Sequence, residues 1–147
     1  MKKSIVISLF SMVIFFTSCS LVSNTSINTT ATSAGASCGK ILAKLYTQYK
    51  ASGNIDITNT TTLTNVIELS KYYKALKSHQ NDATYKAAFA AGLVTGSNGT
   101  ISPANSLIVV NKILSMSGLD TISSSTASNT IEKIGLVKEL INLFNIF

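Results

Sequence analysis

The stretch CGKILAKLYTQY, residues 38–49, indicates the fold class of the chain. Its apolar side chains recur three or four positions apart, with lysines between them, which is the spacing of one face of an amphipathic α-helix. Glycine is a frequent helix stop, and Gly53 follows three residues after Lys50. We therefore expect a helix that begins near Cys38 and ends before Gly53.

The same spacing predicts four further helices downstream. Their expected spans are about 61–77, 83–95, 103–117 and 130–147. Asn81-Asp82 and Ser102-Pro103 are start signals, because a short polar side chain can accept the unpaired amides of a first turn. No segment alternates strictly between polar and apolar residues, so strands are not expected. The predicted fold class is all-α, a small bundle of four to five helices.

Three of these helices have faces that predict how they pack. In the third, the small residues Ala88, Ala91 and Gly92 would let a neighbouring helix approach closely. The fourth is expected to stop at Gly118. It is expected to bury four apolar residues, Leu107, Val110, Ile113 and Leu114. The last is apolar over most of its surface, with a stripe that includes Ile131, Ile134, Val137, Leu140, Ile141, Phe144 and Phe147. Such a helix is expected to be central in the bundle or covered by a partner.

The N-terminus has the layout of a bacterial export signal. Met1-Lys2-Lys3-Ser4 is basic, and the following residues 5–16 are apolar except for two serines. A transmembrane helix needs about 20 apolar residues, so a permanent membrane span is the weaker interpretation.

After this run, Thr17-Ser18-Cys19 resembles the lipobox of bacterial lipoproteins, in which two small residues precede a cysteine. Phe16 replaces the usual aliphatic residue, as in the looser lipoboxes of Bacteroidota. The resemblance implies that residues 1–18 are a lipoprotein signal peptide, and that Cys19 carries acyl chains such as palmitate and anchors the chain in a membrane. The alternative is ordinary cleavage after Ser20, which would release an unlipidated domain.

The next segment is polar. Residues 20–37 contain no charged residue and eleven Ser, Thr or Asn. We expect the lipidated cysteine and this segment, residues 19–37, to form a flexible tether, followed by a helical domain over residues 38–147.

Composition excludes some partners. The chain has no arginine, and after residue 18 it has ten lysines against six acids. Arginine is the favoured residue for bidentate phosphate and base contacts, so no nucleic-acid role is expected.

Candidate catalytic groups are few. If Cys19 is acylated, Cys38 is the remaining thiol, and we expect it to be buried or to form an intermolecular disulfide. His79, the single histidine, lies in a polar stretch between two helices. A Cys38–His79 pair would make a thiol enzyme, a third hypothesis. Metal-ligand spacing, paired carboxylates and a phosphate loop are absent, so we expect no metal, no cofactor and no enzymatic activity.

Two surface features could have a role. Lys71, Lys74 and Lys77 form a basic patch, which is either a solvated helix face or a contact for anionic lipid head groups or polysaccharide. Asp120-Thr121-Ile122 resembles the short motif for O-glycosylation of exported Bacteroidota proteins, which marks Thr121 as a candidate acceptor.

The sequence thus predicts a non-catalytic, membrane-anchored lipoprotein of the bacterial cell envelope that acts through protein or envelope contacts. The expected location is the outer membrane, on its periplasmic or surface face. The alternative is a carrier that binds an apolar small molecule or lipid between its helices, lined by the last helix and by Ala88 and Gly92.

Overall fold

The computed structural model describes residues 2–120, 122 and 130–147, and the side chains of residues 26–120, 122 and 133–147. Its elements, in chain order, are α1 (Lys2–Ser52), α2 (Thr60–Ser78), α3 (Ala83–Ser97), η1 (Pro103–Asn105), α4 (Ser106–Leu114), η2 (Ser117–Leu119) and α5 (Thr130–Phe144). The described residues contain five α-helices, two short 3₁₀ turns and no strand, which confirms the all-α fold class.

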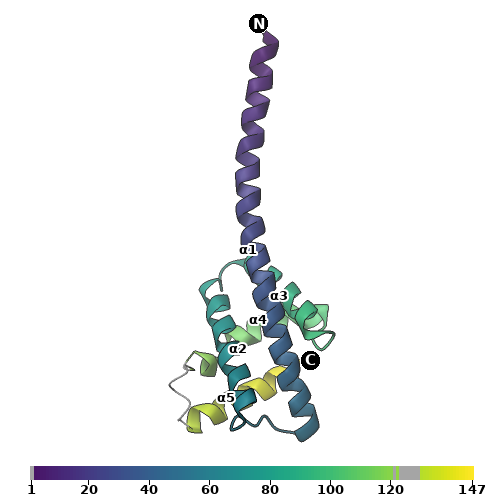
Figure 1. Ribbon diagram of the computed structural model, residues 1–147, viewed down its shortest axis with the longest axis vertical. Coiled ribbons are helices and arrows are strands. Elements are labelled where there is room, and N and C mark those ends of the chain that lie inside the picture. The colour runs from purple at the N-terminus through teal and green to yellow at the C-terminus, as the bar shows by residue number, and fades with distance from the viewer. Residues whose placement is uncertain (1, 121, 123–129) are drawn as a thin grey trace.

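Helix α1 is the axis of the molecule. Figure 1 shows its N-terminal part projecting beyond the bundle, while its C-terminal part lies among the other helices. Helix α2 returns antiparallel to α1, and α3 runs beside α1 in the same direction. In the view of Figure 1, helix α4 crosses behind α1, and α5 lies across the end of the bundle that is far from the N-terminus. The core contains apolar side chains from all five helices, among them Leu42, Leu45, Val66, Leu69, Phe89, Leu93, Val110, Ile113, Leu140 and Leu143.

The expectation of a flexible tether before Cys38 is wrong for residues 26–37. This segment belongs to α1, and Ala31 is fully buried. The hydroxyls of Thr30 and Thr32 donate to carbonyls one turn earlier, at 3.0 and 2.8 Å, so these polar side chains are satisfied within the helix. Packing against α3 overrides the weak helix propensity of Ser and Thr. The packed domain therefore begins near Ala31.

Helices α1 and α3 contact each other through their backbones. A Cβ atom added to Gly92 would lie 2.1 Å from the carbonyl oxygen of Thr32, and one added to Gly96 would lie 1.9 Å from that of Ala36. On the other side, a Cβ at Gly35 would lie 2.1 Å from the carbonyl oxygen of Phe89. A Cβ at Gly39 would lie 2.4 Å from the carbonyl oxygen of Leu93. Each helix thus presents two glycines four residues apart, the spacing that puts them on one face.

Close approach at Gly92 was predicted from the sequence and is confirmed. Ala91, from the same predicted small-residue face, is exposed instead. Gly96, one residue beyond the predicted end of this helix, lies inside α3.

Local signals set several helix ends. The side chain of Asp82 accepts the amide of Tyr85 at 2.9 Å, which confirms the predicted start of α3. The C-cap of helix α3 is Asn98, which has a left-handed conformation with φ of 49°. Ser102 caps the next element as expected, but that element is the short turn η1.

The predicted fourth helix is shorter than expected, since α4 ends at Leu114 and the chain forms η2 before Asp120. Its buried face also differs. Leu107 was expected inside but is 51% exposed, and Val109 is buried in its place. Because apolar residues surround α4 on nearly all sides, periodicity could not select the face that packs.

Helix α5 is peripheral rather than central. Leu136, Leu140 and Leu143 are buried, whereas Ile134 is 52% exposed. The rings of Phe144 and Phe147 contact Tyr46 of α1, with centroid distances of 5.5 and 5.3 Å.

Candidate functional site

The thiol of Cys38 lies inside the core. Its side chain has no exposed surface, and burial raises the pKa of the Cys38 thiol far above its ordinary value. The thiol therefore stays protonated at neutral pH and is not accessible for a disulfide with another chain. The expectation that Cys38 is buried is confirmed.

His79 lies elsewhere, at the turn that joins α2 to α3. Its ring is exposed and stacks on Tyr85, with 4.1 Å between centroids and 13° between planes. No hydrogen bond joins His79 to a nucleophile in the described residues. Since Cys38 is fully buried and His79 is exposed, the Cys38–His79 thiol-enzyme hypothesis is wrong.

Acidic side chains are used mainly within the fold. Asp56 accepts from the amide and hydroxyl of Thr58, and the hydroxyl bond in particular lowers the pKa of the Asp56 carboxyl. Asp82 caps α3. Within the described side chains, no three His, Cys, Asp or Glu residues are grouped so as to hold a metal ion.

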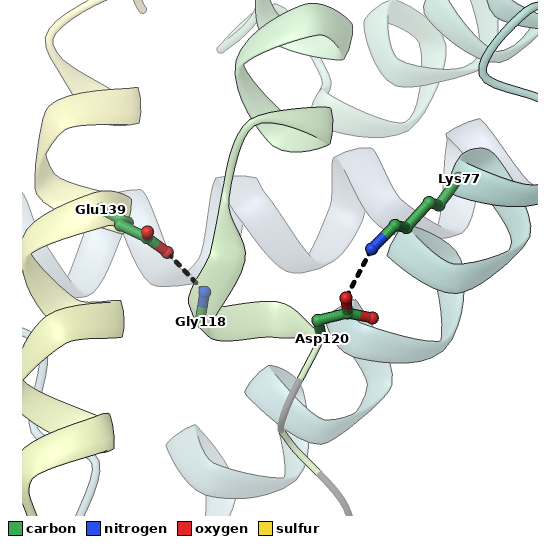
Figure 2. Close-up of polar contacts among 4 residues, drawn as sticks. All are labelled: Lys77, Gly118, Asp120 and Glu139. Atoms are coloured by element: carbon green, nitrogen blue, oxygen red, sulfur yellow. Dashed lines mark hydrogen bonds and ion pairs between the residues drawn. The ribbon is translucent and has the colours of Figure 1, made fainter.

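The basic patch on α2 is partly neutralised. Figure 2 shows Lys77 facing Asp120, with which it forms an ion pair. The hydrogen bond to Asp120 raises the pKa of Lys77, and its ammonium also lies 5.4 Å from the ring centroid of Tyr73. Lys71 and Lys74 are exposed and make no ion pair within the part of the chain that the structure describes. Two solvated lysines on one helix face give weak, salt-sensitive attraction for anions.

The loop after α4 is held at its start by two helices. Glu139 of α5 accepts from the hydroxyl of Ser117 and from the amide of Gly118, both at 3.1 Å. Figure 2 shows the second of these hydrogen bonds. Asp120, the first residue of the predicted glycosylation motif, is held by Lys77 of α2. Thr121, the candidate acceptor, lies outside the described residues.

Gly92, which was expected to line a ligand cavity between helices, is packed against α1. Gly92 faces the backbone of α1 rather than an empty space, and Phe89 and Leu93 beside it are fully buried. A concave space of about 460 Å³ lies instead at the surface, between residues 54–58 and α5.

The predicted anchor residue, Cys19, lies within the N-terminal part of α1, whose side chains the structure does not describe. In the described part of the chain, no helix is both long enough and apolar enough to cross a bilayer.

Comparisons with known proteins add no assignment, because no protein family, no curated protein and no solved structure matches this chain.

Two features of the structure were not predicted from the sequence. Gly35 and Gly39, like Gly92 and Gly96, are four residues apart, and this spacing could have predicted the backbone contact between α1 and α3. The surface hollow has no signal of this kind, because its two sides are about 75 residues apart in the chain.

Proposed function

We propose that the chain is a non-catalytic lipoprotein of the bacterial cell envelope, anchored through Cys19 and acting by contact with another envelope component. The observation that carries this proposal is the order of its N-terminal segments: a basic start, an apolar run and Thr17-Ser18-Cys19. The chemistry of the folded part is compatible with it, since the Cys38 thiol is buried and protonated.

The geometry of α1 bears on how such an anchor would present the domain. Cys19 and Ala31, the first buried residue among the described side chains, lie on the same helix. At 1.5 Å per residue, this separation corresponds to about 18 Å along the helix axis. A helical connection of this length would hold the bundle close to the lipid head groups in one orientation, whereas a flexible tether would allow many. More than one acyl chain at Cys19 would make the attachment stable, since each buried methylene contributes about 0.8 kcal/mol.

Intact-mass analysis of the protein recovered from its native membrane tests the anchor. The expected species begins at Cys19 and carries added acyl mass. Cys19→Ser is the matched control, and it should leave an unprocessed or soluble chain without lipid. A wild-type species that begins at Leu21 and carries no lipid would overturn the proposal.

Two further measurements test the location and the mode of action. Separation of inner and outer membranes by density should place the lipidated species in the outer-membrane fraction, and protease treatment of intact cells then distinguishes the surface face from the periplasmic face. Chemical cross-linking in intact cells should join the wild-type domain to a specific envelope partner. The same yield from Cys19→Ser would contradict a role for the anchor in that contact.

A further inference from the structure

The surface hollow between residues 54–58 and α5 combines an apolar floor with positive charge. Ile55 is buried beneath it, and Ile57 and Val137 are half-buried. Ile134 is 52% exposed although it lies beside these side chains in a concave space. A volume of about 460 Å³ is within the ordinary range of small-molecule sites.

Lysines flank the apolar residues of α5 on both sides. At 100° per residue, Ile134 and Val137 lie between Lys133 and Lys138 around the helix. Both lysines line the hollow, and neither makes an ion pair within the described residues. Asp56 is also part of the lining, but its carboxylate accepts two hydrogen bonds from Thr58. Two ammonium groups against this one carboxylate leave the lining with a net positive charge.

The hollow is remote from the N-terminal end of α1. Figure 1 shows α5 and the C-terminal end of α1 at the opposite end of the bundle from the N-terminus. A membrane that held the N-terminal part of α1 would therefore not reach this site. With the chain anchored in this way, the occupant of the hollow would be a free molecule and not a lipid of the anchoring membrane.

We propose that this hollow binds a free anionic amphiphile of the fatty-acid type. The acyl chain lies over Ile57, Ile134 and Val137, and the carboxylate faces Lys133 or Lys138 at the rim. The apolar floor would favour any single alkyl chain, and the two lysines select a negative head group over a neutral or positive one. This binding site goes beyond the proposed lipoprotein function. The hollow itself does not depend on lipidation of Cys19, whereas the choice of a free amphiphile over a lipid of the anchoring membrane rests on that proposed function.

Photo-cross-linking of the full chain in zwitterionic lipid nanodiscs tests the proposal. The probe is a twelve-carbon fatty acid with a diazirine near the end of its chain, and the control probe is an alkyl trimethylammonium of the same length. Chymotryptic peptide mapping locates the label, since this protease does not cut at the lysines to be changed. We expect saturable labelling within residues 54–58 and 133–138 that laurate competes away.

Charge reversal gives a matched pair of variants. The double change Lys133→Glu and Lys138→Glu should lower this labelling about tenfold, which corresponds to about 1.4 kcal/mol. The double change Lys71→Glu and Lys74→Glu on α2 alters the net charge by the same amount as the first pair. It should keep the labelling within about twofold of wild type, since only the charges beside the hollow act at short range. Lys133→Arg with Lys138→Arg should retain labelling, which separates loss of charge from loss of fold.

Several outcomes would overturn the proposal. They are equal labelling by the cationic probe, equal loss in the two charge-reversed variants, and labelling confined to the N-terminal part of α1. Labelling of the hollow should also persist in nanodiscs that contain anionic phospholipid. Its selective loss there would assign the site to phospholipid head groups instead of a free amphiphile.

Discussion

Replacing Gly96 or Gly92 with alanine tests the contact that holds α1 against α3. The added methyl carbon would lie 1.9 Å from the carbonyl oxygen of Ala36 in the first variant and 2.1 Å from that of Thr32 in the second. Close contacts between carbon and carbonyl oxygen are about 3.3 Å or longer, so the helices must separate by more than about 1 Å. Both oxygens belong to the backbone of α1, and therefore no side chain can rotate to make room.

The expected loss of stability follows from two opposing terms. Overpacking of a close contact costs typically about 1–3 kcal/mol, and the upper end applies because a whole helix has to move. Alanine is favoured over glycine inside a helix by about 1 kcal/mol, which offsets part of this cost. We therefore expect each variant to lose about 2 kcal/mol in the free energy of unfolding. With a urea dependence of about 2 kcal/mol per molar, the unfolding midpoint would fall by about 1 M.

Urea unfolding of the full chain in a mild detergent, followed by far-ultraviolet circular dichroism, measures this change. Gly135→Ala is the matched control, because it makes the same substitution inside α5 at a position where an added Cβ meets nothing within 4 Å. That variant should be stabilised by about 0.5–1 kcal/mol through helix propensity alone.

The direction of the change in the free energy of unfolding decides whether the contact exists. If Gly92→Ala and Gly96→Ala were stabilised as much as Gly135→Ala, the backbone contact between α1 and α3 would be refuted. The parallel placement of these two helices, and the helical state of residues 26–37 that depends on it, would then also be wrong.

Three further predictions concern side chains. Burial raises the pKa of the Cys38 thiol above its value in the unfolded chain, so above about pH 8.5 the thiol ionises in the unfolded state but not in the folded state. The free energy of unfolding should therefore be constant with respect to this group below about pH 8.5 and fall by about 1.4 kcal/mol per pH unit above it. In a Cys19→Ser background, urea unfolding between about pH 8.5 and pH 9.5 should show this decline, and Cys38→Ala should not. At higher pH the raised pKa of Tyr85 adds a decline that both proteins share. Glu139→Ala should cost about 1–2 kcal/mol by releasing two hydrogen bonds to η2, and a midpoint unchanged from wild type would contradict the tie between α5 and η2. Asp82→Ala should cost about 1 kcal/mol, with Asp82→Ser near wild type, if the side-chain bond to the Tyr85 amide caps α3.

Local chemistry made several elements predictable. The starts at Asp82 and Ser102 depend on a side chain and an amide three residues away, so the residues nearby in the chain contain all the needed information. The apolar spacing after Cys38 likewise predicts both the helix and the burial of Ile41, Leu42 and Leu45.

Other features required partners from distant segments. The Ser/Thr-rich residues before Cys38 have weak helix propensity, and their helical state reflects the contact with Gly92 and Gly96, more than 50 residues downstream. The face of α4 that packs could not be read from periodicity, since Leu107 and Val109 are similarly apolar and only one of them lies against the core.

The sequence alone thus determined the helical class and most helix limits, because these depend on neighbouring residues and on apolar spacing along one chain segment. Tertiary structure decided that residues 26–37 join the packed domain, that α5 lies at the periphery and that a charged-rimmed hollow forms between α5 and residues 54–58. Each of these depends on how closely two distant backbones approach, and that distance is set by the shapes of both surfaces together.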